Sequence, residues 1–167
     1  MESKFYGRCD LFFQSGCKVT FGKNFILSSQ GGIDNFMRSK IYVLNGAKLI
    51  VGEYTGMTNV AIHCHQEITI GHHVNIGAGT MLFDTDFHST KWQDRLNRAT
   101  DVKNKVCRPI HIGNLCFIGT RCIIGKGVTI GDKTIIAAGS VVTKSIPANC
   151  IAGGNPCRVI RELKNEG

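Results

Sequence analysis

The sequence predicts an all-β chain that winds into a parallel β-helix, and two columns of recurring residues predict it. From residue 112 onward, a branched aliphatic residue followed by a small one opens every six-residue block. These openers are Ile112, Ile118, Ile124, Ile130, Ile136 and Val142. Four residues after each opener comes a second column, formed by Cys116, Cys122, Val128, Thr134, Ser140 and Ile146. Uninterrupted self-similarity of this kind is the signature of a repeat architecture.

The spacing within a block fixes its local structure. Alternate residues face the interior, which indicates a short strand, and a glycine or small polar corner every six residues turns the chain. Three strands then close one triangular coil, and successive coils stack at about 4.8 Å. The aliphatic column fills the interior, so Cys116 and Cys122 are expected to be small buried groups rather than nucleophiles.

The same period recurs less regularly earlier in the chain, in segments such as Ile70–Gly71 and Ile76–Gly77. We therefore expect one domain over residues 1–167, with the β-helix over residues 19–153. An N-terminal cap is expected over residues 1–18, because an uncovered stack of strand edges would promote aggregation.

A short helix is expected over residues 155–165 at the other end of the coil. Asn155 and Pro156 are suited to the N-cap and the first helical position, respectively. Val159, Ile160 and Leu163 would then form one apolar stripe, folded back on the last coil.

The repeat fails between Leu82 and Ile110, where continued counting places polar residues such as His88 and Asp94 at interior positions. The chain must therefore leave the coil in a loop over residues 88–109. Excursions of this length in a compact domain are commonly functional or disordered. This one holds six basic and two acidic residues and the only tryptophan, Trp92. It is interpreted either as a solvated charged loop or as an acceptor-binding flap.

Composition narrows the possible functions. The net charge of +8 fits an acidic partner or a basic solvated surface. Aromatic residues make up only 8% of the chain and are not interleaved with the basic residues, which favours a phosphorylated cofactor or an anionic polymer over nucleic acid. No stretch has the ~20 apolar residues of a transmembrane segment, and the first residues lack an apolar signal core. With eight cysteines and no CxxC pair, a reducing cytoplasmic location is expected.

Several segments of this chain resemble the hexapeptide-repeat acetyltransferases over about residues 50–165. They are Phe117-Ile118-Gly119, Ile130-Gly131-Asp132, residues 138–147 (AGSVVTKSIP) and residues 152–161 (AGGNPCRVIR). Residues 84–89 (DTDFHS) and the basic excursion resemble the sugar and capsular polysaccharide O-acetyltransferases within that family. The resemblance implies a left-handed coil, although parallel crossovers are normally right-handed. It also implies a homotrimer with active sites between its subunits.

The resemblance implies an acetyl-CoA-dependent O-acetyltransferase in which His88 is the general base. Its imidazole would take the proton of an acceptor hydroxyl as that oxygen attacks the thioester, without a covalent enzyme intermediate. Asp86 is expected to orient His88, with Asp84 or a backbone carbonyl as alternatives. A backbone N–H near Gly119–Thr120 would stabilise the oxyanion.

The resemblance also assigns the binding residues, and no metal is expected. Acetyl-CoA would contact Phe117, Gly119, Thr120, Ala138, Thr143 and Lys144, with its phosphates at Arg158 and Arg161. A solvated surface is the alternative interpretation of the two arginines. The residues expected to bind the acceptor are Asn59, Asp84, Trp92 and Arg95.

The acceptor and the reaction class leave alternatives open. Members that act on maltose or galactosides carry an N-terminal helical segment that has no counterpart in this pattern. Their acceptor-side asparagine and aspartate are matched only loosely, near Asn59 and His65, and Phe117 stands where tryptophan is common. A polysaccharide or lipid-linked glycan acceptor is therefore favoured over a small sugar. The alternatives are an N-acetyltransferase on an amino sugar, a non-enzymatic scaffold, and a zinc carbonic anhydrase using histidines among His63, His65, His88 and His111.

Overall fold

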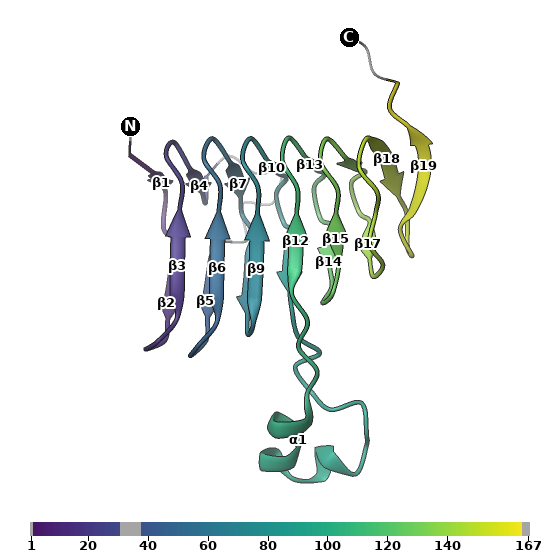
Figure 1. Cartoon of the computed structure of the whole chain (residues 1–167). Helices are drawn as coiled ribbons and strands as arrows, with labels where there is room; N and C mark the ends of the chain where they lie inside the picture. The colour runs from purple at the N-terminus through teal and green to yellow at the C-terminus, as the bar shows by residue number, and fades with distance from the viewer. Residues whose placement is uncertain (1, 31–37, 165–167) are drawn as a thin grey trace.

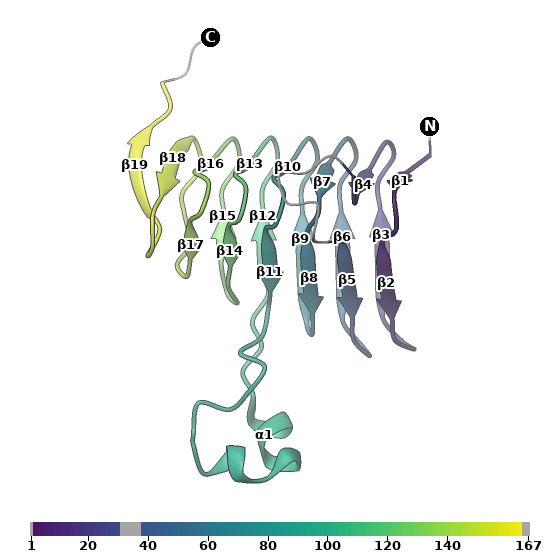
Figure 2. The same cartoon turned by 180° about the vertical axis from the view of Figure 1, so that it is seen from behind.

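The computed structural model describes residues 2–30 and 38–164, which form a stack of triangular coils with one protruding excursion (Figures 1 and 2). Strands β3, β6 and β9 run upward at the front of Figure 1, and the chain then passes over the top to strands behind them. The coils meanwhile advance from left to right, so the β-helix is left-handed, as expected. No helix within the described residues has the length and hydropathy that crossing a membrane would need.

The strands of the coils form three sheets, and each coil from β1 to β15 contributes one strand to each of them. The six-stranded sheet contains β2 (Asp10–Phe13), β5 (Lys40–Val43), β8 (Ala61–Cys64), β11 (Met81–Phe83), β14 (Ile123–Ile124) and β17 (Val141–Val142). The five-stranded sheet contains β3 (Lys18–Phe21), β6 (Lys48–Val51), β9 (Glu67–Ile70), β12 (Ile110–Ile112) and β15 (Thr129–Ile130). The eight-stranded sheet contains β1 (Lys4–Tyr6), β4 (Ile26–Ser28), β7 (Gly56–Thr58), β10 (Asn75–Ile76), β13 (Phe117–Ile118), β16 (Ile135–Ile136), β18 (Cys150–Gly153) and, paired antiparallel at its edge, β19 (Arg158–Glu162).

The two predicted columns fill the interior of the coil. Ile118 pairs in register with Ile136, and both side chains are fully buried. The second column is buried as well, and its polar members donate to carbonyl groups of the corners. The Thr134 hydroxyl donates to the carbonyl of Pro147 at 2.7 Å, and the Cys122 thiol to that of Ala137 at 3.2 Å. Buried polar groups are thereby satisfied, and the interpretation of Cys122 as a packed interior residue is confirmed.

Some corner glycines are required because the next coil lies directly over them. A Cβ added at Gly52 would lie 2.5 Å from the backbone carbon of Gly71 and 2.6 Å from the nitrogen of His72. Gly56, in the same coil, would meet only the side-chain oxygen of Asn75, at 3.6 Å. The recurrence of glycine after the opener thus reflects backbone stacking as well as turn formation.

The interruption predicted in the repeat is an ordered excursion that begins earlier than expected, directly after β11. Its stem is a short antiparallel pair, in which Thr85 is bridged to Cys107 and the N–H of Arg108 donates to the carbonyl of Asp84 at 2.9 Å. Its head contains the 3-10 helix η1 (Asp94–Leu96) and helix α1 (Arg98–Asn104), and it projects below the coils in Figure 1. The side chain of Asn97 caps α1 by accepting from the N–H of Ala99.

Both predicted ends of the domain need correction. Residues within the expected cap, 1–18, form β1, β2 and the start of β3, which belong to the first coil. Over the described part of the expected helix at residues 155–165, which ends at residue 164, the structure instead has a turn, beginning at Gly154 with φ of 99°, followed by β19. A strand forms hydrogen bonds with the N–H and C=O groups at the open edge of β18, whereas a helix packed there would leave these groups unpaired.

We expect Gly52→Ala to destabilise the protein and Gly56→Ala to have little effect. The added methyl at position 52 must push two coils apart, an overpacking cost of about 1–3 kcal/mol. Thermal unfolding followed by circular dichroism should show a Tm lowered by roughly 2–4 °C per kcal/mol for a chain of this size. Equal Tm values for the two variants would contradict the stacking argument.

Candidate active site

His88 lies at the start of the excursion, where its imidazole is held by a carboxylate of α1. Its Nδ1 is 2.7 Å from Oδ2 of Asp101, while 69% of the His88 side chain remains exposed. The other oxygen of Asp101 accepts from the N–H of Ser89 at 2.7 Å. These hydrogen bonds, the one from His88 first, hold the pKa of the Asp101 carboxyl below its usual range.

The contact with Asp101 determines which imidazole nitrogen is basic. An ionised carboxylate only accepts hydrogen bonds, so Nδ1 of neutral His88 carries the hydrogen. Nε2 therefore presents its lone pair to solvent and can accept a proton. This is the arrangement that a general base needs.

Asp86 and Asp84, the expected orienting residues, have other partners. Oδ1 of Asp86 forms an ion pair with Nζ of Lys126 at 2.7 Å, although the carbonyl of Asp86 does accept from the N–H of His88. The assignment of Asp86 as the orienting carboxylate is therefore corrected to Asp101.

Asp84 is fully buried and has a structural role at the base of the excursion. Its carboxylate accepts backbone N–H bonds from His65, Gln66 and Glu67 at 2.7, 2.7 and 2.8 Å. Burial raises the pKa of Asp84, and these three hydrogen bonds oppose that rise. Asp84 was expected to bind the acceptor, but its carboxylate has no exposed surface and cannot contact one.

The other two acceptor candidates on the excursion differ in how they are held. The Trp92 side chain is 61% exposed. Arg95 donates from Nη1 to the carbonyl of Ser89 at 2.7 Å, which brings η1 against the segment that carries His88. Asn59, by contrast, is buried in a left-handed corner with φ of 48°, so its position serves the coil.

Phe117, Gly119, Thr120 and Ala138 lie together at or near the corner between the eight-stranded and six-stranded sheets. Phe117 projects outward and is 50% exposed. A Cβ on Gly119 would lie 2.5 Å from the nitrogen of Ala138, and the carbonyl of Thr120 accepts from the N–H of Gly139. No hydrogen bond within the described part of the chain uses the N–H of Thr120. This corner therefore offers an exposed aromatic ring beside a backbone donor.

The remaining predicted cofactor residues are exposed and spread over two regions. Thr143 and Lys144 follow β17 at the corner from which the excursion emerges two coils earlier. Arg158 and Arg161 lie on β19, where, among residues 2–30 and 38–164, their Nη1 atoms donate to the carbonyls of the adjacent Cys157 and Glu162. Their guanidinium groups are thus accessible to anionic ligands.

Within one chain, the structure does not bring His88 and the Gly119–Thr120 corner together. The excursion leaves after β11, between the six-stranded and five-stranded sheets. The Gly119–Thr120 corner lies at the opposite side of the six-stranded sheet, between β13 and β14. The whole width of that sheet separates the base from the expected oxyanion donor.

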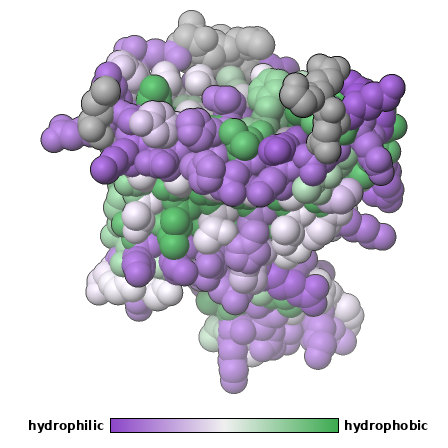
Figure 3. All heavy atoms as spheres, turned by 45° about the horizontal axis from the view of Figure 1, so that its top comes forward, coloured by the Kyte–Doolittle hydropathy of each residue, from purple (hydrophilic) through white to green (hydrophobic). Residues whose placement is uncertain are grey.

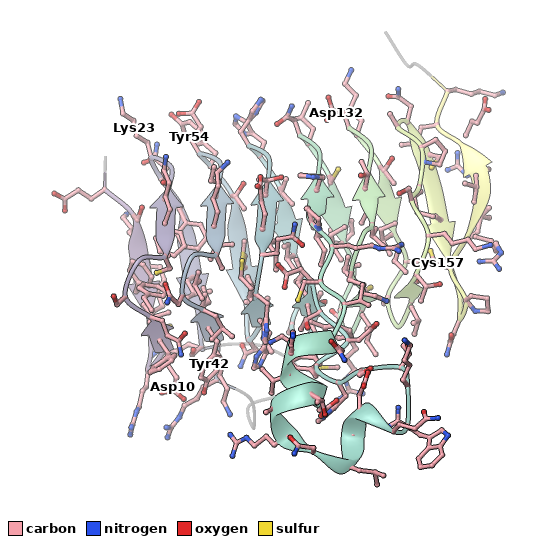
Figure 4. All side chains as sticks on the ribbon, turned by 60° about the horizontal axis from the view of Figure 1, so that its bottom comes forward. Asp10, Lys23, Tyr42, Tyr54, Asp132 and Cys157 are labelled. Atoms are coloured by element: carbon pink, nitrogen blue, oxygen red, sulfur yellow. The ribbon has the colours of Figure 1, made fainter. Side chains whose placement is uncertain are left out.

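The other histidines are distributed along the outside of the coil. His63 stacks on Tyr42 with ring centroids 4.9 Å apart, and Nδ1 of His111 lies 2.6 Å from the hydroxyl of Thr69. Tyr42 is labelled in Figure 4 on the side of the coil that bears the excursion. Over residues 2–30 and 38–164, no group of three or more His, Cys, Asp and Glu side chains is arranged to hold a metal ion.

Sequence reasoning missed two residues of the excursion, Asp101 and Lys105. Nζ of Lys105 lies 2.8 Å from Nδ1 of His65. One signal was available, because Asn97 begins a capped helix in which Asp101 is one turn further along. An acidic side chain inside an otherwise basic segment also marks Asp101.

Comparison with known proteins places these features in context. Residues 109–144 match a family model described as the hexapeptide repeat of succinyl-transferase. The chain is 36% identical over 135 residues to galactoside O-acetyltransferase of Escherichia coli (strain K12), an alignment that covers 80% of this chain and only 64% of that enzyme. It is 35% identical over 148 residues to the putative colanic acid biosynthesis acetyltransferase WcaF of the same strain, covering 88% of this chain and 70% of WcaF.

A solved structure shows the same fold with a ligand. It is a hexapeptide-repeat acetyltransferase from Vibrio cholerae O1 biovar eltor in complex with acetyl-coenzyme A, which is 29% identical to this chain. The superposition has a TM-score of 0.65 and covers 93% of this chain and 72% of the other.

We expect Asp84→Asn to destabilise the protein far more than Asp86→Asn. An amide at position 84 presents one acceptor oxygen and one donor group to three backbone N–H groups, and each donor left unpaired costs about 1–3 kcal/mol. Loss of the ion pair between Asp86 and Lys126, whose side chains are each 28% exposed, costs about 1 kcal/mol. Urea unfolding midpoints measure both changes, and similar midpoints would refute the structural role of Asp84.

Proposed function

The chain belongs to the hexapeptide-repeat acetyltransferases, and we propose that it transfers an acetyl group from acetyl-CoA to a hydroxyl of a sugar or polysaccharide. The observation that carries this proposal is the pair formed by His88 and Asp101, with the exposed Nε2 of His88 left as a proton acceptor. The relatives named as galactoside and colanic acid acetyltransferases support a glycan acceptor.

Acetyl-CoA supplies an activated acetyl group as a thioester, and the residues of the Gly119–Thr120 corner fit such a ligand. The unpaired N–H of Thr120 is suited to the negative charge that develops on a carbonyl oxygen. The exposed ring of Phe117 offers apolar contact beside it, and Arg158 and Arg161 provide cations for phosphates. We include Ala138 in this binding surface, and we assign Thr143 and Lys144, across the six-stranded sheet, to the part of the cofactor site on the side of the excursion.

In the proposed reaction, Nε2 of His88 takes the hydroxyl proton while the acceptor oxygen forms a bond to the acetyl carbonyl carbon. The carbon–sulfur bond then breaks, and the imidazolium returns the proton to the departing thiolate. Asp101 keeps the proton of Nδ1 in place and stabilises the imidazolium, as a positioning residue. No covalent bond to the protein is required.

The separation of His88 from the Gly119–Thr120 corner supports assembly of the site between subunits. In a homotrimer, the excursion of one subunit would face the corner of its neighbour, so that each site combines both halves. We therefore propose a trimer in which a single chain is inactive.

We expect His88→Ala to lower kcat by about 10²–10⁴-fold, the usual contribution of a general base. The affinity for acetyl-CoA should be unchanged, because the imidazole of His88 is held by Asp101 and not by any of the proposed cofactor residues. Release of free CoA from acetyl-CoA in the presence of a panel of oligosaccharides measures the first quantity, and calorimetric titration the second. A fully active variant would overturn the mechanism.

Asp101→Asn should lower kcat by about 10–100-fold while the KM for acetyl-CoA stays constant. In a protein that already carries His88→Ala, the same substitution should have no additional effect on kcat, because Asp101 acts only through His88. Additive losses in the double variant would show that Asp101 has another role.

A further inference from the structure

Lys105 and His65 form a cationic pair that the proposed reaction does not use. Nζ of Lys105 lies 2.8 Å from Nδ1 of His65, which follows β8. Burial, followed by the charge of Lys105, lowers the pKa of His65 to about 4. His65 is therefore neutral near pH 7 and accepts a hydrogen bond from the ammonium group. The pair carries one positive charge, and none of the ion pairs among the described residues neutralises it.

This charge is held close to the proposed general base. Lys105 is the C-cap of α1, and its N–H donates to the carbonyl of Asp101 at 3.1 Å, so the two residues are one helical turn apart. Side chains four positions apart lie on one side of a helix, separated by roughly 6 Å of rise. The same side of α1 thus orients His88 with Asp101 and presents a cation with Lys105.

Phe87 lies between the Lys105–His65 pair and the proposed base His88. It precedes His88, has φ of 61°, and is 38% exposed. Its ring centroid lies 5.6 Å from that of His65 and 5.4 Å from that of His63, edge-on in both cases. A ligand held at Nε2 of His88 would therefore have an aromatic surface and a cation beside it.

The aromatic surface continues along the six-stranded sheet. Phe12, Tyr42, His63 and Phe83 occupy one register row on β2, β5, β8 and β11. The centroid distances are 5.9 Å from Phe12 to Tyr42 and 4.9 Å from Tyr42 to His63. Flat rings spaced by one strand offer apolar contact to the C–H faces of successive sugar rings. The row leads to the base of the excursion.

The surrounding charge has the same sign as Lys105. Both acidic residues in the head of the excursion already have partners, since Asp94 accepts from the Ser89 hydroxyl and Asp101 from His88. The face of the excursion visible in Figure 3 is mainly hydrophilic. The excursion holds six basic residues against these two acidic ones, and such an excess of positive charge attracts anions.

We propose that the acceptor is an acidic glycan, and that Lys105 binds a sugar carboxylate while a hydroxyl of the same or the adjoining sugar lies at Nε2 of His88. This inference rests on the proposed function and specifies its substrate class. A single ammonium, supported by a neutral imidazole, suits a monodentate contact to one carboxylate oxygen, whereas phosphate recognition favours the bidentate geometry of arginine.

The test compares two oligosaccharide acceptors of equal length, one built from hexuronates and one from the corresponding neutral hexoses. We expect the native protein to prefer the hexuronate. Lys105→Gln should lower kcat/KM for the hexuronate by about 10- to 150-fold, the usual range for the loss of a charge-assisted hydrogen bond, and leave the neutral acceptor unchanged. Lys105→Arg should retain most of the preference.

Lys103→Gln is the matched control, because it removes an exposed positive charge from the same helix without touching His65. It should leave the ratio of the two kcat/KM values as in the native protein. An equal loss for both acceptors in Lys105→Gln would assign Lys105 a merely structural role, and a raised KM for acetyl-CoA would assign it to the cofactor. Either result overturns the acidic-acceptor proposal alone. Failure to acetylate either glycan overturns the proposed function as well.

Discussion

Backbone stacking of one coil on the next is the constraint on which the rest of this structure depends. The parallel hydrogen bonds that join successive coils leave no room for a side chain at corners such as Gly52, where an added Cβ would lie 2.5 Å from the backbone of Gly71 in the next coil. Interior residues must in turn match the column above and below, as Ile118 matches Ile136. The β-helix is therefore a rigid support whose exposed surface can vary while its interior repeats.

The excursion is joined to this support by polar contacts at its stem. The antiparallel bridge between Thr85 and Cys107 forms the stem of the excursion. At its base, the buried carboxylate of Asp84 accepts three backbone N–H bonds from the turn between β8 and β9 in the preceding coil. The position of His88 then follows from the stem that joins it to the coil and from the contact of its imidazole with Asp101. A short helix at the tip of a two-stranded stem is thus held precisely enough to orient an imidazole.

The division of the candidate site between two corners connects the fold to the chemistry. A triangular coil places the excursion and the Gly119–Thr120 corner on opposite sides of one sheet, so no motion within a coil unites them. Subunit association is the simplest means of combining a base and an oxyanion donor built in this way. The aromatic row and Lys105 lie on the side of the proposed base, which is why we propose that the acceptor is recognised at the excursion.

The sequence by itself determined the coil, the interior columns and the place where the repeat is interrupted, because a period of six acts on every block and depends only on local alternation. It also singled out His88, at the start of the interruption, as the residue for which we propose the role of general base. Only the tertiary structure decided the partners of that residue. Asp101 is thirteen positions away and Asp86 only two, yet helix α1 brings the former to Nδ1 while Lys126 takes the latter. The C-terminal segment was likewise decided by the open edge of β18, since an edge with unpaired hydrogen-bonding groups stabilises a strand where local signals favour a helix.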